Sequence, residues 1–190
     1  MSKKEQMLNI ALNLFTKEGY DNVGIQKIVT QVGVTKPTLY HYFGSKEGLL
    51  EEVLKTNYGT FFIDMNQKSE YNGDIVLTLE NLVFHFMNFA KNNKEFYRLI
   101  MNLSYAPEES LVHKCMIKYL IMQHQIIENV FKNAEKQHGN MIGRSTMYSF
   151  TFLGMINSAI SYYFFTKDKE DINEEAGRKL CRQFMYGIFS

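Results

Sequence analysis

The residues from Thr35 to Lys46 carry the side chains of this 190-residue chain that are best suited to binding a charged polymer. Their polar groups include hydroxyls, two ammonium groups and one imidazole, on Thr35, Lys36, Thr38, Tyr40, His41, Tyr42 and Lys46. Such groups donate hydrogen bonds to phosphate oxygens and to the edges of bases. The alternative is a purely structural role, in which Tyr40, Tyr42 and Phe43 are aromatic residues of the core. Three rings so closely spaced cannot all face one core, so the pattern favours a nucleic-acid contact.

The charge distribution supports the same interpretation. The whole chain has a formal net charge of +1, which alone argues against a purely electrostatic nucleic-acid binder. Residues 1–50, however, contain six lysines and four acidic residues, and no acid lies between Asp21 and Glu47. A small basic patch on a neutral chain is typical of a nucleic-acid-binding head joined to a body that does not bind nucleic acid.

Short helices are predicted to position this stretch. Apolar residues at three-and-four spacing predict one helix over about residues 2–17 and another over about 24–32. Gly33 can adopt the left-handed backbone that a tight turn between helices requires. The next helix is predicted to begin at Lys36 and to end near Phe43.

Thr35 is predicted to be the N-cap of that third helix, with its hydroxyl accepting from backbone amides. Pro37 falls in the first turn, where its missing N–H costs nothing. Leu39 and Phe43 share a face and are expected to point to the core. Together these elements predict a helix-turn-helix.

The remainder is predicted to be helical as well, so the fold class is all-α. Helices are expected over about residues 46–66, 74–92, 94–105, 107–138, 145–166 and 173–189. We expect two domains, a helix-turn-helix head at 1–46 and a larger helical body at 47–190 for ligand binding and dimerisation.

The run Ser145–Thr166 has no formal charge over 22 residues and could be a membrane span by length. Its many hydroxyl and amide side chains argue against a span and favour a helix buried in a core and a subunit interface. A membrane-associated helical protein is one alternative for the function of this chain.

The segment Gly33-Val34-Thr35-Lys36-Pro37-Thr38-Leu39-Tyr40-His41-Tyr42-Phe43, followed by Ser45-Lys46-Glu47 and Leu49-Leu50, resembles the DNA-binding signature of TetR-family transcriptional regulators. The resemblance covers about residues 5–50. It implies that Thr35, Lys36, Thr38, Tyr40, Tyr42 and Lys46 hold phosphates, and that Gln26, Lys36, Pro37 and His41 approach base edges. Gly24 and Ile25 depart from the family pattern, which often has Ser or Thr there, so a phosphate contact is lost.

The resemblance further implies a homodimer that binds a palindromic operator in double-stranded DNA and a small-molecule effector held in the body. The last two long helices would pack against their copies as a four-helix bundle. The residues expected at this dimer interface are Phe150, Gly154, Asn157, Ser161, Phe165, Leu180, Phe184 and Ile188.

Aromatic rings and methionines are abundant in the body and suit a largely apolar or aromatic effector. The residues expected to bind it are Phe61, Phe62, Met65, His85, Phe86, Phe89, Tyr97, Met101, Tyr119 and Met122. Ordinary core and dimer packing is the simpler explanation for any single one of them. Spacing does not indicate which of them line a cavity.

Other chemistry is not indicated. The sequence has no phosphate-binding glycine loop, nucleophile elbow or paired-carboxylate motif, so no catalytic residue, enzyme activity or cofactor is expected. His124 and Glu128 share a helix face, but no third metal ligand is evident, so no metal site is expected. Cys115 and Cys181 form no CxxC motif and no signal peptide is visible, which predicts a cytoplasmic protein without membrane association.

The expected function is therefore that of a ligand-responsive repressor. The alternative is a small-molecule-binding or protein-interaction dimer with a vestigial DNA-binding head.

Overall fold

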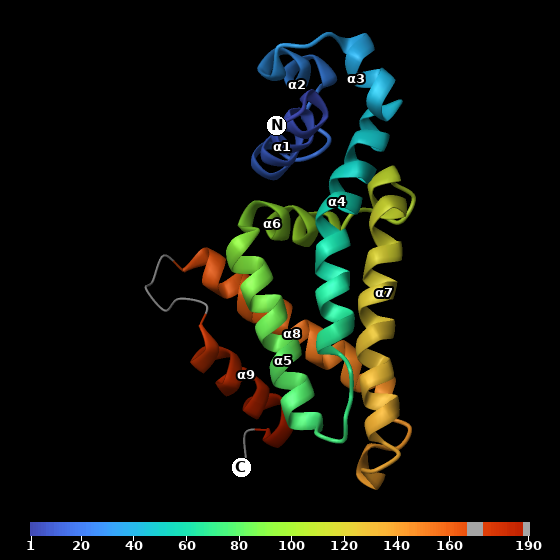
Figure 1. Cartoon of the computed structure of the whole chain (residues 1–190), viewed down its shortest axis with the longest axis vertical. Coiled ribbons are helices and arrows are strands. Elements are labelled where there is room, and N and C mark those ends of the chain that lie inside the picture. The colour runs from blue at the N-terminus through green and yellow to red at the C-terminus, as the bar shows by residue number, and fades with distance from the viewer. Residues whose placement is uncertain (167–172, 188–190) are drawn as a thin grey trace. The chain divides into compact units, whose positions relative to one another are not determined.

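The computed structural model describes residues 1–166 and 173–187, and every regular element within these ranges is a helix (Figure 1). The elements are α1 (Lys3–Glu18), α2 (Ile25–Val32), α3 (Lys36–Phe43), α4 (Lys46–Lys68), α5 (Ile75–Asn92), α6 (Lys94–Leu103), α7 (Leu111–Ala134), the 3-10 helix η1 (Gly139–Met141), α8 (Ser145–Phe165) and α9 (Glu174–Tyr186). The prediction of an all-α fold with an N-terminal helix-turn-helix is confirmed.

The helices form two compact units. The first comprises Met1–Thr60 with Asn93–Leu120, and the second comprises Phe61–Asn92 with the described residues from Ile121 onward. The long helices α4 and α7 each contribute to both units. The predicted functional boundary after residue 46 is a different division and stays a prediction.

The first unit is supported by α1. This helix starts with a capping box, in which the Glu5 amide donates to Ser2 Oγ over 3.2 Å and the Ser2 amide donates to Glu5 Oε2 over 2.6 Å. Met7, Leu14 and Phe15 form its buried face, and the helix packs against α2 and α6. These contacts give the short helix α2 the tertiary support that an isolated helix of its length lacks.

The turn between α2 and α3 depends on Gly33, which has a φ of 72°. Its amide and that of Val34 each donate to the carbonyl oxygen of Val29 over 3.0 Å, which closes α2. Because a side chain at this φ would be strained, glycine is the residue that lets the chain reverse directly into α3.

The start of α4 is equally constrained. Ser45 Oγ accepts from the Gly48 amide over 3.0 Å and so caps the start of this helix. Gly48 packs so closely on the end of α3 that a Cβ at this position would overlap the carbonyl oxygen of Phe43. The two helices can therefore meet at this angle only with glycine at position 48.

The second unit is built on α5, which packs against α8 and α9. Gly177 lets α9 approach α5 closely, because a Cβ there would lie 2.7 Å from Cε1 of Phe84. The rings of Phe152 and Phe184, on α8 and α9, have centroids 5.1 Å apart and fill the adjacent core.

The predicted limits of the helix at 107–138 are wrong at both ends. The residues after Pro107 form a turn, in which the Ser110 amide donates to the carbonyl oxygen of Pro107 over 2.9 Å. Ser110 Oγ then accepts from the His113 amide over 3.1 Å, and this hydroxyl rather than the proline starts α7. None of the described helices, α8 included, is long and apolar enough to cross a membrane.

The close approach at Gly48 makes a testable prediction. Gly48→Ala places a methyl group against the backbone of α3 and should lower the free energy of unfolding by about 1–3 kcal/mol. The matched control is Gly59→Ala in the same helix, where a Cβ meets no atom within 4 Å. The free energy of unfolding of this control should rise by about 0.5–1 kcal/mol, because alanine has a better helix propensity than glycine. Urea unfolding measures both, and equal shifts in the two variants would contradict the packing argument.

Candidate nucleic-acid interface

The helix α3 is attached to the first unit mainly through one side chain. Leu39 is completely buried and Phe43 is half-buried, as their shared face predicted. Tyr40 and Tyr42 are each 45% exposed. The remaining faces of this eight-residue helix are therefore open to a large ligand.

The structure brings the nine residues predicted to bind DNA onto α2, the turn after it, α3 and the first residue of α4. Those exposed to solvent are Gln26, Thr35, Lys36, Pro37, Tyr40, His41 and Tyr42, and those half-buried are Thr38 and Lys46. Exposure leaves these side chains accessible to phosphates and bases, but the role of each residue stays a prediction.

Thr35 occupies the N-cap position of α3, but its hydroxyl does not bind the backbone as predicted. Thr35 Oγ1 instead lies 3.0 Å from Oγ1 of Thr38. No side chain among the described residues caps the first amides of α3. Those amides, at the positive end of the helix dipole, can donate hydrogen bonds to an anion such as a phosphate.

Lys46 is held in place by residues far from it in sequence. Its Nζ lies 4.2 Å from the ring centroid of Tyr20 and donates to the carbonyl oxygen of Asp21 over 3.4 Å. Partial burial lowers the pKa of Lys46 below its ordinary value. Tyr20 is thus a positioning residue that we did not predict. Its aromatic character after Gly19 was visible in the sequence, but its partner was not.

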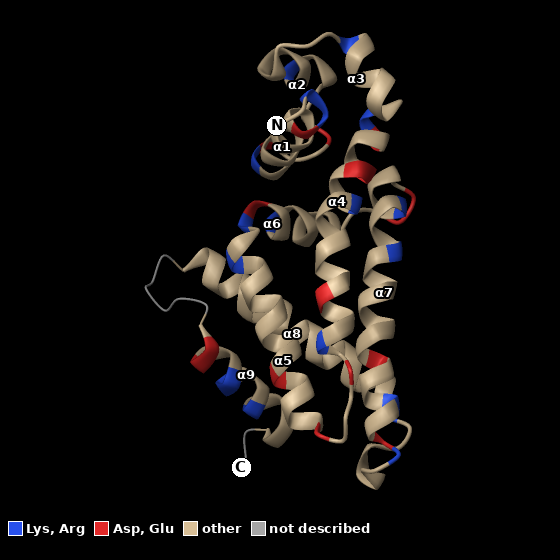
Figure 2. Cartoon of the chain, viewed as in Figure 1, with Lys and Arg blue, Asp and Glu red and all other residues tan. Residues whose placement is uncertain are grey.

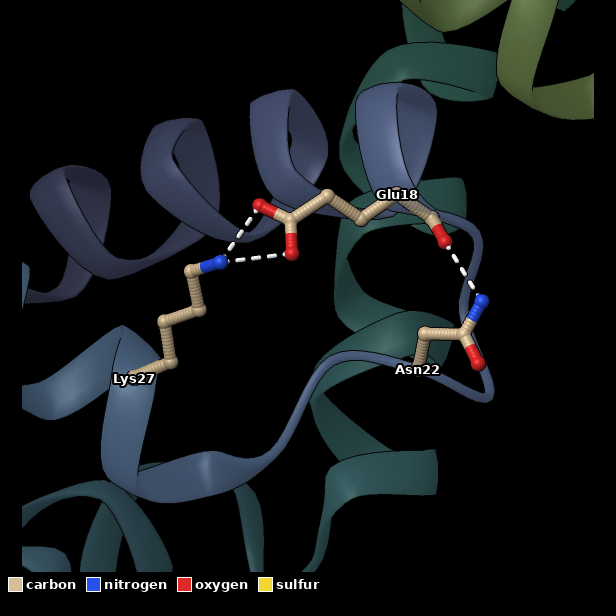
Figure 3. Close-up of polar contacts among 3 residues, drawn as sticks. All are labelled: Glu18, Asn22 and Lys27. Atoms are coloured by element: carbon tan, nitrogen blue, oxygen red, sulfur yellow. Dashed lines mark hydrogen bonds and ion pairs between the residues drawn. The ribbon is translucent and has the colours of Figure 1, made fainter.

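The helix α2 contributes an amide and a neutralised cation. Gln26 Nε2 donates to Thr30 Oγ1 over 3.2 Å on the exposed face. Lys27 Nζ forms an ion pair with Glu18, at 2.7 Å from Oε1, and Asn22 Nδ2 donates to the carbonyl oxygen of Glu18 over 2.8 Å (Figure 3). The charge of Lys27 is therefore largely neutralised by Glu18.

The distribution of charged residues agrees with an anion-binding surface along α2 and α3. The helices α2 and α3 contain lysine but no acidic residue, whereas acids appear from the start of α4 onward (Figure 2). A negatively charged ligand approaching α3 meets no carboxylate on that helix.

The residues predicted to bind an effector are divided between the two units, with Tyr97, Met101 and Tyr119 in the first and the other seven in the second. The buried ones are Phe61, Phe62, Met65, Phe86, Tyr97 and Tyr119, the half-buried ones are His85, Phe89 and Met101, and Met122 is exposed.

Phe61 is the centre of a packed aromatic cluster. Its ring centroid lies 4.7 Å from that of His85 and 4.8 Å from that of Phe89. Burial lowers the pKa of His85, which favours the neutral imidazole within this cluster. Close packing of rings is typical of a core, so a role in effector binding stays a prediction.

Of the residues predicted at a dimer interface, five lie on α8 and two on α9. Phe150, Gly154 and Phe165 are exposed, whereas Asn157, Ser161, Leu180 and Phe184 are half-buried, and Ile188 lies outside the described residues. The ring of Phe184 packs on Phe152 of the same chain. An exposed aromatic face on α8 is compatible with pairing, which stays a prediction.

Neither thiol is activated. Burial raises the pKa of Cys115 and raises that of Cys181 to about 12. Within the described ranges, no group of three or more His, Cys, Asp and Glu side chains is placed to hold a metal ion.

Comparisons with known proteins place this geometry in a family. Residues 7–53 match the family model described as bacterial regulatory proteins, tetR family. The biofilm operon icaADBC HTH-type negative transcriptional regulator IcaR of Staphylococcus aureus is 32% identical over 109 residues, covering 56% of this chain and 56% of that protein. The chain thus spans about half the length of the curated relatives it matches.

Solved structures share the fold over nearly the whole chain. FadR from Bacillus subtilis in complex with stearoyl-CoA aligns with a TM-score of 0.81 at 17% identity, covering 97% of this chain and 98% of that one. AibR in complex with isovaleryl coenzyme A and operator DNA aligns with a TM-score of 0.76 at 19% identity, covering 99% and 100%.

The resemblance seen in residues 5–50 is therefore confirmed by the matched segment, the relative and the fold. Residues 7–53 belong to the tetR family of bacterial regulatory proteins, and the described residues share the fold of the solved structures.

Proposed function

We propose that the chain is a ligand-responsive transcriptional regulator, a repressor that binds a palindromic operator as a homodimer. The observation that carries the proposal is α3, which Leu39 anchors while its hydroxyl, imidazole and ammonium groups face solvent. In a helix-turn-helix motif, the second helix, presented in this way, enters the major groove of DNA.

Within this proposal the exposed residues divide into two groups. Thr35, Thr38, Tyr40, Tyr42 and Lys46 hold phosphates, and Gln26, Lys36, Pro37 and His41 approach base edges, with Lys36 also able to reach a phosphate. The phosphate contacts set orientation and affinity, whereas the base contacts choose the sequence. The uncapped amides at the start of α3 add a further phosphate contact.

Pairing of two copies through α8 would supply the twofold symmetry that a palindrome requires. One side of α8 exposes apolar and small residues at helical spacing, namely Met147, Phe150, Thr151, Gly154, Ser158 and Tyr162. Glycine and serine near its middle allow close approach of a second helix, and the flanking rings bury apolar area.

The comparisons support regulation by a small molecule. IcaR is named a negative transcriptional regulator, FadR was solved with stearoyl-CoA, and AibR with isovaleryl coenzyme A and operator DNA. We propose a small, largely apolar or aromatic effector for this chain. It would act by population shift, favouring a spacing of the two α3 helices that does not match successive major grooves.

The DNA-binding proposal is tested by removing single donors from α3. Lys36→Ala and Tyr42→Phe should each weaken binding to the DNA that flanks the gene encoding this chain. We expect a loss of about fivefold or more, because each variant removes roughly one hydrogen bond to a charged group. Lys27→Ala is the control, because Lys27 is paired with Glu18, and its affinity should stay within about twofold of wild type. Band-shift titrations at several salt concentrations measure these effects.

Lys36→Ala should also reduce the slope of log affinity against log salt by about one, because one fewer counterion is released. Unchanged DNA affinity in both α3 variants would refute the proposal that this surface binds DNA. A wild-type protein that binds small molecules but no flanking DNA would favour the vestigial-head alternative.

The pairing proposal is tested at Gly154, which is exposed and where an added Cβ would meet no atom within 4 Å. Gly154→Arg places a charge in the proposed seam without an internal clash and should yield a monomer with operator affinity reduced at least about tenfold. Gly59→Arg, at another exposed helical glycine with open space, should leave the oligomeric state unchanged. Sedimentation velocity measures both, and a dimeric Gly154→Arg protein would refute the seam.

A further inference from the structure

The second unit contains a cavity of about 650 Å³ that none of the ten predicted effector residues lines. It lies between the first turn of α5, the end of α7, η1, α8 and α9. Its volume falls within the roughly 300–1,000 Å³ of ordinary ligand pockets. The aromatic cluster around Phe61, by contrast, is closed by edge-to-face packing, and Phe61 is only 1% exposed.

The walls of this cavity are mainly apolar and flexible, although Asn140, Thr151 and Gln183 also line it. Four of its lining residues are methionines, Met141 of η1, Met147 and Met155 of α8 and Met185 of α9. Unbranched, polarisable side chains adapt to ligands of different shape, which is why methionine is frequent at promiscuous binding surfaces. In the part of the chain that the structure describes, no Asp, Glu, Lys or Arg lines the cavity, so an apolar ligand body meets no charged group there.

One lining side chain has an unused hydrogen-bonding atom. Nε2 of His138 is buried and has no hydrogen-bond partner among the described residues. Buried polar atoms are nearly always paired, so this orphaned nitrogen indicates a missing partner. Because the atom is closed to water, the imidazole of His138 must turn for the nitrogen to face the cavity. An imidazole N–H suits a carboxylate oxygen, and no acidic residue in the described lining would repel that carboxylate.

We propose that this cavity binds small apolar monocarboxylic acids, with the carboxylate on His138 and the hydrocarbon part among the four methionines. The proposal deepens the proposed function, on which it rests for its regulatory consequence, by naming the site and the class of the effector.

The position of the cavity explains how occupancy would reach the dimer. Met147 and Thr151 line the cavity and also lie on the exposed side of α8 that we propose for pairing. A ligand that fits one rotation of α8 better than another therefore favours one arrangement of the seam. Binding and pairing are coupled through a shared helix, and the coupling is reciprocal.

The binding site can be located by NMR with methionine methyl groups labelled with carbon-13, since the chain has 11 methionines. The test compounds are 2-naphthoic acid, which is flat, and decanoic acid, which is a chain. Addition of at least one should shift the signals of Met141, Met147, Met155 and Met185 and leave those of Met65 and Met101 in place. Shifts confined to Met65 or Met101, or no shift with either acid, would overturn the assignment.

A matched pair of variants tests occupancy of the cavity. Val76 lines the cavity and the adjacent Leu77 does not, and both are exposed in the first turn of α5. Val76→Trp should fill the cavity and raise the Kd of the binding acid at least about tenfold, whereas Leu77→Trp should keep it within about twofold. Equal affinities in the two variants would place the ligand elsewhere.

His138→Phe is a second variant that does not fill the cavity. It keeps a ring but removes the orphaned nitrogen, and it should weaken binding of the acid about tenfold. Unchanged affinity in this variant would overturn the role of His138, even if Val76→Trp failed to fold.

Band-shift assays on the wild-type protein separate this inference from the proposed function. Methyl shifts in the cavity without operator binding would support the ligand site and refute the regulator. Operator binding without methyl shifts would support the regulator and refute the site.

Discussion

The candidate DNA-binding surface depends on the burial of Leu39. This is the one fully buried side chain of an eight-residue helix, and a helix so short has little stability of its own. The orientation of α3 is therefore set at its two ends as much as by its own packing. Gly33 provides the reversal before the helix, and Gly48 allows α4 to start directly against its last turn. Two glycines and one leucine together determine which side chains face solvent.

The local parts of this arrangement could be predicted from the sequence. Helix periodicity, the turn glycine and the i, i+4 pair Leu39 and Phe43 depend on neighbouring residues, and the structure agrees with each. Choices between competing local partners were harder. The Thr35 hydroxyl pairs with Thr38 rather than with the backbone, and Ser110 rather than Pro107 starts α7.

Contacts between distant segments could not be predicted at all. Nothing near Lys46 indicates that its ammonium lies over Tyr20, and nothing in the composition of the body separates core methionines from cavity methionines. Met65 is fully buried, whereas Met155 and Met185 line a cavity, although all three lie within helices. The difference arises from how helices are spaced, which a single sequence does not record. The expected effector residues were chosen by type, and type alone favours the tightly packed cluster around Phe61.

The position of Lys46 also has a mechanical consequence. Its side chain joins the first residue of α4 to the loop that follows α1, through the ring of Tyr20 and the carbonyl group of Asp21. An ammonium group has three N–H donors, so it can keep the bond to Asp21 and still bind an external anion. A phosphate held there would bridge the loop and α4 and oppose any rotation of the helix start. The same ammonium group would then hold the two segments together more firmly when a phosphate is bound than when it is absent.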